Sequence, residues 1–277
     1  MGSAAWAPTE WGLVVSAFSD VDAAVDPHRL IVSLENSARG LASMKHYLAV
    51  AHALRAPVGP ILDVGCGAGH DIAVLADHRI TSVVGVDPSN VMLETTRDRT
   101  TAALAQADGA RLPFRRGSFA GAWIERVLMH VTDPSAVLAE VVRVVEPEGL
   151  VTVFEPDWSS LIANGRVIPT GWTTIARHPS IGRDVGALLQ QLGCFVRDRV
   201  EERSWWTFAQ FEAITNRAIS RAAERGGSIA IQPWIDEVRA SAAAGTFTAE
   251  MVKVAWIATT PPRSAVGQGT ASTSRVT

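Results

Sequence analysis

The sequence predicts an α/β protein in which helices cover both faces of a doubly wound, mostly parallel sheet. Short apolar strands alternate with helical segments, which is typical of parallel strands joined by right-handed crossovers. A glycine-rich turn joins the first strand to the next helix, and an acidic residue ends or follows each of the first three strands. We expect seven strands, the last of them antiparallel to its neighbours.

The helices and strands are expected at regular intervals. Residues 43–54 form a predicted helix with Met44, Tyr47, Leu48 and Ala51 on one face. The expected strands span 61–64, 82–87, 103–107, 119–124, 150–155, 195–201 and 247–257, and the helices between them span 70–77, 89–99, 134–145 and 180–192.

Five segments are predicted along the chain. Residues 1–56 form a helical segment, and residues 57–205 form the main part of the sheet with its helices. Residues 206–246 form a helical insertion before the last core strand, at 247–259. A strand, a helical excursion and a returning strand indicate an antiparallel pair at one edge. Residues 260–277 are rich in Pro, Ser, Thr and Gly, and we expect them to be disordered.

Composition limits the classes of function. The 277 residues suit one globular domain, or one domain with a large insertion. A net charge of -3 gives no overall basic surface for nucleic acid, and no apolar run approaches the roughly 20 residues that span a bilayer. The two cysteines, Cys66 and Cys194, lie far apart and form no metal or disulfide pattern. We expect a cytoplasmic monomer or homodimer with no metal, membrane or nucleic-acid partner.

The most informative motif is the turn DVGCGAG at 63–69, which directly follows the first strand and precedes a helix. Glycines let the backbone turn tightly and let a ligand lie against the main chain. In a doubly wound sheet such a turn lies where ligands bind. The glycine pattern alone is weak evidence. Its third glycine comes one residue earlier than in the dinucleotide pattern G-x-G-x-x-G, whose last position is His70 here.

Three carboxylates discriminate between ligands. Asp63 lies under the turn, where it would repel a pyrophosphate but attract an ammonium group. Asp87 ends the second strand, where a carboxylate can accept hydrogen bonds from both ribose hydroxyls. Asp108 follows the third strand and can accept a hydrogen bond from an adenine amino group. Each residue alone would also suit a turn or a helix cap. Together, in this order, they favour an adenosyl ligand that has an ammonium group and no phosphate.

At these motifs the chain resembles the class I S-adenosylmethionine-dependent methyltransferases, and more narrowly their type 11 or UbiE-like branch. The resemblance runs from about residue 20 to residue 258. Its motifs lie at 61–69, 84–89, 107–114, 123–133 and 143–158. It implies a Rossmann-like core, an N-terminal helical lid over the cofactor and an acceptor pocket built by the insertion.

The resemblance also implies the cofactor-binding residues. The methionine part would be held by Asp63, Gly65 and Gly67, and Gly69 would shape the turn. Ribose and adenine would be bound by Asp87, Ser89, Met92, Asp108 and Gly109. The remaining cofactor contacts would come from Arg126, after the fourth strand, and from Tyr47, which could reach the cofactor carboxylate.

Methyl transfer from a sulfonium mainly needs alignment and exclusion of water, and a general base helps when the acceptor is a hydroxyl or a carbon acid. His130 is the best candidate base because it follows the fourth strand and has a suitable ordinary pKa. Glu125 and Glu155 also follow strands at the ligand edge and could orient an acceptor. Each of these residues has a structural alternative. His130 could be packed in its loop, and the two glutamates could cap helices or pair with arginines.

Four of the nine tryptophans lie in regions expected to border the acceptor: Trp158, Trp205, Trp206 and Trp234. Aromatic walls suit a planar, apolar or cationic acceptor. Ordinary core packing is the alternative for at least half of the tryptophans.

We therefore expect a methyltransferase that acts on O, N or C of a small molecule, in specialised (natural-product) metabolism. A protein that binds S-adenosylmethionine without transferring methyl, as a cyclase or a binding module, would carry the same motifs. A nicotinamide-dependent oxidoreductase is disfavoured by Asp63, by the glycine spacing and by the lack of a Tyr-x-x-x-Lys pair.

Overall fold

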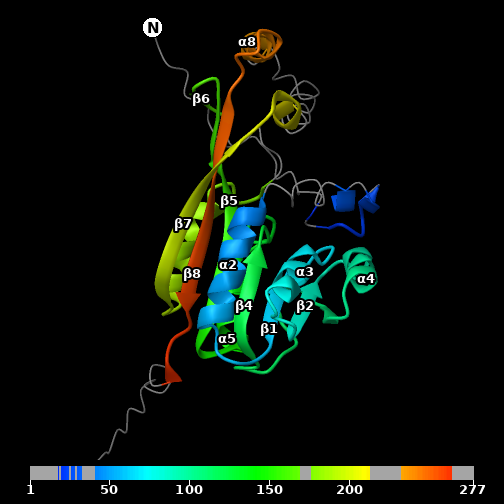
Figure 1. Ribbon diagram of the computed structural model, residues 1–277, viewed down its shortest axis with the longest axis vertical. Helices are drawn as coiled ribbons and strands as arrows, with labels where there is room; N and C mark the ends of the chain where they lie inside the picture. The colour runs from blue at the N-terminus through cyan, green and yellow to red at the C-terminus, as the bar shows by residue number, and fades with distance from the viewer. Residues whose placement is uncertain are drawn as a thin grey trace, which may run out of the picture.

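The computed structural model describes residues 18, 20–24, 26–28, 30–32, 41–168, 176–212 and 232–263. Within them, one eight-stranded sheet runs in the order β3-β2-β1-β4-β5-β8-β7, with β6 paired to β5 (Figure 1). The strands are β1 (Ile61–Val64), β2 (Val83–Asp87), β3 (Ala103–Gln106), β4 (Phe119–Glu125), β5 (Val145–Ala163), β6 (Arg166–Val167), β7 (Phe195–Trp205) and β8 (Ala249–Thr259). The helices are α2 (Ala42–Arg55), α3 (His70–Asp77), α4 (Asn90–Arg99), α5 (Pro134–Val144), α6 (Ile181–Gln191) and α8 (Gln232–Ala243).

The predicted doubly wound sheet is confirmed. Strands β1 to β5 pair in parallel, and β8 pairs antiparallel with both β5 and β7. The chain moves outward from β1 to β3 and then returns to β4 beside β1, so the strand order reverses between β1 and β4. The seven expected strands are present, and the two-residue strand β6 is an addition. Ligands bind at such a reversal in open α/β sheets.

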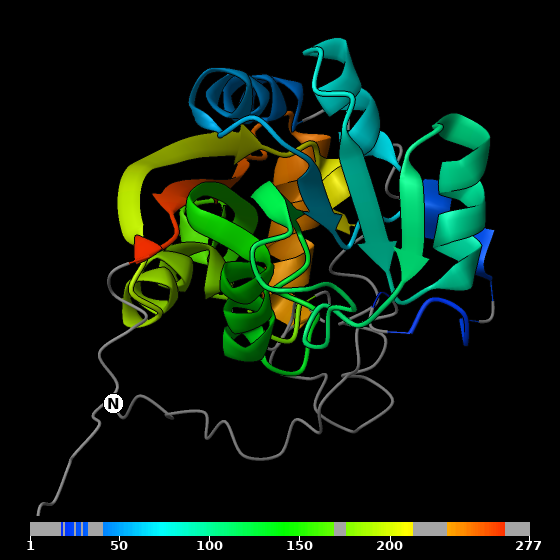
Figure 2. The ribbon, with the colours of Figure 1, turned by 90° about the horizontal axis from the view of Figure 1, so that it is seen from below.

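Helices cover the two faces of the sheet. Apolar side chains of α2, α3 and α4 pack in a core on one face, and those of α5 and α6 pack in a core on the other (Figure 2). Every residue of β1 and β4 is buried, as expected for central strands covered on both sides. The edge strand β7 instead alternates between exposed and half-buried residues.

Strand β5 is much longer than the expected 150–155. It begins at Val145, which pairs with Phe119, and continues to Ala163. Its outer part pairs with β8 and turns at Asn164 and Gly165 into β6. Figure 1 shows β5, β7 and β8 extending past β1 and β4 on the side of α8. The pattern of apolar residues within β5 could not predict the length of this strand. The length depends on pairing with β8, about one hundred residues away in the sequence.

The predicted segment boundaries remain predictions. Most of the N-terminal segment before residue 41, the middle of the insertion (213–231) and the tail from residue 264 lie outside the described residues. Helix α8 lies within the predicted insertion. Among the described helices, none has the length and apolar character needed to cross a membrane.

A buried histidine links α2 to the sheet. His52 is almost fully buried, its Nε2 lies 2.9 Å from the Thr152 hydroxyl, and its ring lies 5.8 Å from that of Trp123. Burial lowers the pKa of His52 to about 4. The neutral imidazole is therefore the form that the folded protein accommodates.

We expect acid to destabilise the fold through His52. The unfolded chain binds this proton near pH 6.5 and the folded chain only near pH 4, so stability present above pH 6.5 is lost as the pH falls toward 4. The contribution lost between pH 8 and about pH 5.5 should be about 1.4 kcal/mol. Denaturant unfolding of His52→Gln should show a correspondingly weaker pH dependence. The exposed His28→Gln variant should behave like the wild type, and equal slopes for all three proteins would contradict the prediction.

Candidate active site

A cavity of about 1320 Å³ opens where the strand order reverses. Its walls come from the carboxyl ends of β1, β2 and β4, from the loops that follow them, and from parts of β5, β7 and β8. The predicted site residues that line it are Gly65, Gly67, Asp87, Met92, Asp108, Gly109, Glu125, Arg126, His130, Trp158, Trp205 and Trp206.

The glycine turn adopts a backbone that few other residues tolerate. Gly65, Gly67 and Gly69 have φ values of 70°, 50° and 79°. A Cβ atom on Gly65 would lie 2.4 Å from Cγ2 of Val127. The amides of Gly65 and Cys66 both donate to the Val86 carbonyl, at 2.8 and 3.0 Å. The turn thus lies against the loop after β4 and the end of β2, leaving room only for main chain.

Asp87 joins the glycine turn to the start of α4. Its Oδ2 accepts a hydrogen bond from the Gly67 amide and its Oδ1 accepts one from the Ser89 amide, both at 2.9 Å. Ser89 in turn caps α4 by accepting from the Met92 amide. Burial raises the pKa of Asp87. Asp87 and Met92 line the cavity, whereas Ser89 lies behind them and holds the helix end.

The described part of the N-terminal segment reaches this end of the cavity. Asp22 accepts hydrogen bonds from the Ser89 hydroxyl at 2.5 Å and from the Asn90 amide at 2.9 Å. Val21 packs in one apolar cluster with Met92 and lines the cavity. This segment therefore contacts the same helix end that carries the predicted ribose-binding residues.

Asp63 is a buried carboxylate without a partner. It is 1% exposed, and neither of its oxygens has a hydrogen-bond partner among the described residues. Burial, reinforced by Asp71 and Glu125, raises its pKa well above the ordinary value. A buried unpaired carboxylate is costly. A cation that reached this position, directly or through water, would relieve that cost.

Asp108 and Gly109 complete the strand ends around the turn. Asp108 Oδ1 accepts a hydrogen bond from the Ala110 amide at 2.9 Å, and both residues line the cavity. A Cβ on Gly109 would approach Val64 and Val137 to 3.2 and 3.3 Å, so the backbone packs closely here. The three predicted carboxylates thus surround the glycine turn, two of them in the cavity wall.

The other end of the cavity has an aromatic wall. The Trp158 indole N–H donates to Met129 Sδ at 3.2 Å, and its ring meets that of Trp206 edge to face at 5.8 Å. Trp205 also lines the cavity and is 68% exposed. Trp234 does not line it and packs against Phe211 instead.

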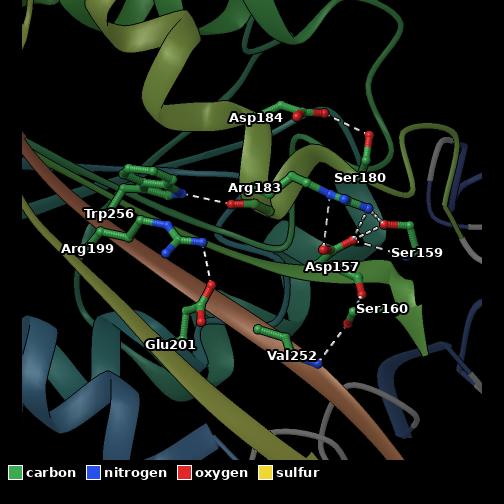
Figure 3. Close-up of polar contacts among 11 residues, drawn as sticks. Asp157, Ser159, Ser160, Ser180, Arg183, Asp184, Arg199, Glu201, Val252 and Trp256 are labelled. Atoms are coloured by element: carbon green, nitrogen blue, oxygen red, sulfur yellow. Dashed lines mark hydrogen bonds and ion pairs between the residues drawn. The ribbon is translucent and has the colours of Figure 1, made fainter. Parts of the chain in front are cut away.

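A bulge in β5 places Trp158 in this wall. Pairing with β8 shifts between Asp157 and Ile162, so residues 158–161 lie opposite Met251 alone. The Ser160 hydroxyl accepts from the Val252 amide at 2.8 Å and donates to the Asp157 carbonyl at 2.6 Å. The Asp157 carboxylate accepts from the Ser159 amide and pairs with Arg183 of α6 at 3.2 Å (Figure 3).

Part of the chain matches a known protein family. Residues 62–153 match the sequence profile of the type 11 family described as "Methyltransferase domain". The chain contains a class I methyltransferase domain. The family resemblance expected from the sequence is thereby confirmed.

Individual relatives match over part of their length. The chain is 34% identical over 221 residues to the "Uncharacterized 37.1 kDa protein in transposon TN4556" of Streptomyces fradiae, covering 73% of this chain and 62% of that protein. It is 32% identical over 143 residues to an "O-methyltransferase" of Pyrenophora dematioidea, covering 48% of this chain and 51% of that protein. It thus spans less than two thirds of either relative.

The fold is also that of a solved structure. The "[4+2]-Cyclase SpnF" superposes with a TM-score of 0.52 over 78% of this chain and 81% of that chain, at 19% sequence identity. At this identity the similarity shows the fold alone.

A buried ion cluster that joins α2 to the ends of the sheet was missed by sequence reasoning. Lys45 Nζ lies 2.5 Å from Asp71 Oδ1 and 2.9 Å from Glu125 Oε2, and Arg126 Nε lies 2.9 Å from Glu125 Oε1. Burial and the neighbouring Asp71 raise the pKa of Glu125 to about 7. Glu125 therefore belongs to an ion cluster in the cavity wall, and both of its oxygens face cations.

The predicted face of the helix before β1 was wrong in one respect. Lys45 is buried in α2 together with Leu48, whereas Tyr47 is 37% exposed. The Tyr47 hydroxyl donates to Asp198 Oδ2 on β7 at 2.5 Å, and Tyr47 does not line the cavity. A lysine seldom lies on a buried face unless it is paired, and its partners are distant in sequence.

Glu155 holds the loop after β4. Its Oε1 accepts hydrogen bonds from the amides of Val127 and Leu128 at 2.8 and 2.6 Å. It is fully buried and does not line the cavity, and burial raises its pKa to about 8. Its geometry is that of a positioning residue for the loop, which gives no support to direct contact with an acceptor. Arg126 at the loop's start has a φ of 54°, in the sparsely populated left-handed region.

His130 lines the cavity but is a weak base. Its ring centroid lies 5.4 Å from that of Phe18. Burial, together with Arg126, lowers the pKa of His130 to about 3. The neutral imidazole is therefore the form that the folded protein favours, and the general-base role of His130 stays a prediction.

Space at the glycine turn is testable with a matched pair of variants. Gly65→Ala and Gly165→Ala both place a side chain at positive φ, but only the first creates a clash, since nothing lies within 4 Å of a Cβ at Gly165. Gly165→Ala should lower the free energy of unfolding by about 1 kcal/mol. Gly65→Ala should cost roughly 1–3 kcal/mol more. Equal losses in denaturant titrations would show that contact with Val127 does not constrain the turn.

Proposed function

We propose that this protein is an S-adenosylmethionine-dependent methyltransferase that acts on a small molecule. The observation that carries the proposal is the buried, partnerless Asp63 under the glycine turn. Asp87 and Asp108 at the next strand ends complete a set of hydrogen-bond acceptors for an ammonium group, ribose hydroxyls and the adenine amino group. No phosphate-bearing ligand would gain from Asp63 at this position.

The residues present suit the cofactor. Asp63 would hold its ammonium group, directly or through water, and the glycine turn would lie along its amino-acid part. Asp87 would accept hydrogen bonds from ribose, and Asp108 with Gly109 would bind adenine beside Met92. When bound, the cofactor supplies a methyl group already activated on a sulfonium.

The protein's own contribution to transfer would be alignment and exclusion of water. Glu155 fixes the loop that carries Arg126 and His130, so the wall facing the methyl group is held by hydrogen bonds. The Trp158–Trp206 pair would bind an apolar or aromatic acceptor body. The similarity to a protein named O-methyltransferase supports an oxygen acceptor.

The alternatives have less support. A nicotinamide dinucleotide would bring a pyrophosphate against Asp63. A cofactor-binding cyclase would have the same cofactor end, and the likeness to SpnF reaches the fold only. Formation of S-adenosylhomocysteine in the presence of an acceptor separates transfer from binding alone.

Asp63 gives the decisive test. Because its charge is buried without a partner, Asp63→Asn should raise the free energy of unfolding of the ligand-free protein at pH 8 by about 1 kcal/mol. The same change should weaken binding of S-adenosylmethionine and S-adenosylhomocysteine about ten-fold or more, because it removes the charge facing the ammonium. Denaturant unfolding and calorimetric titration give the two quantities.

The exposed Asp98→Asn variant is the matched control and should change neither quantity. NADH should not bind any of the proteins. NADH binding without an adenosyl response would replace the proposal with a dehydrogenase. Unchanged adenosyl binding in Asp63→Asn would remove the observation on which the proposal depends.

A further inference from the structure

Charged side chains line both ends of the cavity. The cofactor end has the carboxylates of Asp71, Asp87, Asp108 and Glu125 together with the cations Lys45 and Arg126, which pair with Asp71 and Glu125. At the other end, which we call the acceptor end, the wall comprises Met129, Trp158, Arg177, Trp206, Met251 and Lys253, and Asp133 lies next to Thr132, which Arg177 contacts. Arg177 therefore gives this end a cation that can bind an anion.

Two hydrogen-bond donors of the acceptor end are buried without partners. Arg177 Nε and Trp206 Nε1 have no hydrogen-bond partner among the described residues. The rest of the Arg177 guanidinium makes one long contact, from Nη1 to the Thr132 hydroxyl at 3.4 Å. Buried donors are nearly always satisfied in native proteins, so each orphan needs an explanation. A ligand that supplies acceptor oxygens would satisfy both.

The two donors flank one continuous wall. The Arg177 amide donates to the Met129 carbonyl at 2.7 Å, and Met129 Sδ accepts from Trp158 Nε1 at 3.2 Å. Trp158 meets Trp206 edge to face, and the Trp206 amide is fixed on the Ala249 carbonyl at 2.9 Å. An acceptor lying on this wall would have Arg177 on one side and Trp206 on the other.

The two cations of this end differ in their surroundings. Lys253 on β8 pairs in register with Glu202 on β7, and Glu202 and Glu125 both favour its charged form, so Lys253 already has carboxylates near it. Asp133, the acidic lining residue that follows Thr132, directs Oδ1 to the first amides of α5. The charge that this end offers to an anion is therefore that of Arg177.

None of the three predicted catalytic residues is well placed as a base for a neutral hydroxyl. Glu125 lies between Lys45 and Arg126, Glu155 does not line the cavity, and burial lowers the pKa of His130. A nucleophile that arrives already ionised needs no base. The two orphan donors, together with the placing of these three residues, favour an acceptor with an ionised oxygen.

We propose that the acceptor is an organic acid with an apolar or aromatic body, and that its carboxylate is bound by Arg177 and Trp206 and methylated there. This inference rests on the proposed methyltransferase function. One carboxylate oxygen uses a lone pair to form the new O–CH₃ bond, and the electrons of the broken C–S bond stay on sulfur. The products are a methyl ester and a neutral thioether, and no proton has to be removed.

Matched acid and amide probes test the binding step. 1-Naphthoate and indole-3-acetate, each against its primary amide, are titrated calorimetrically into the full chain saturated with S-adenosylhomocysteine. The acids should bind about ten-fold or more tightly than the amides, because only they offer a charged acceptor to the orphan donors. The ratio should fall to about three-fold or less in Arg177→Gln and in Trp206→Phe, which keeps an aromatic ring but loses the N–H.

Two variants outside the cavity serve as controls. Arg203→Gln removes an exposed arginine whose partner is Glu250, and Trp234→Phe removes an indole N–H that does not line the cavity. Both should retain the wild-type acid preference. Mass spectrometry of reactions with S-adenosylmethionine should then detect methyl esters of the acids and no methylated amides.

The outcomes separate this inference from the function beneath it. If the chain fails to bind S-adenosylhomocysteine at all, the proposed function fails. If it binds this ligand but shows no preference for acids, or keeps the preference in both Arg177→Gln and Trp206→Phe, only the inference about the acceptor is overturned. Methylation of neutral hydroxyls or amines in place of acids would overturn it as well.

Discussion

One electrostatic constraint shapes the whole cofactor end: several carboxylates are buried together, and few cations lie among them. Lys45 meets Asp71 and Glu125 from α2, a helix that lies before the first strand in sequence and across one face of the sheet. The contact ties that helix to the carboxyl ends of the strands. Asp63 is left without such a partner, and its two oxygens are buried with no hydrogen-bond partner among the described residues.

The reversal of strand order brings the glycine turn and the loop after β4 together at one end of the sheet. Because β1 and β4 are neighbours, the glycine turn after β1 and the loop after β4 lie against each other. Hydrogen bonds from this loop to Glu155 and from the glycine turn to Asp87 fix both segments before any ligand is present. The backbone therefore forms the ligand-facing wall, and side chains supply charge around it.

The sequence predicted what depends on neighbours along the chain. The core strands, the glycine turn and the carboxylates at strand ends follow from short motifs. Asp87 and Asp108 line the cavity, and their predicted binding of a cofactor stays a prediction. Features that depend on tertiary contact were missed or misplaced: the burial of Lys45, the weak basicity of His130 and the length of β5. Tyr47 is the clearest case. It was predicted to lie on the buried face of its helix and to reach the cofactor, but it contacts Asp198 on the edge strand β7.

The bulge at residues 158–161 divides the pairing of β5 with β8 into two parts. Pairing of β5 with β8 has one register up to Asp157 and another from Ile162 onward. Residues can therefore be gained or lost in the outer ribbon that leads to α8 without shifting the inner pairs beside the cofactor end. The register on one side of the bulge is therefore independent of the register on the other, so the length of the outer strands and the pairing beside the glycine turn can change separately.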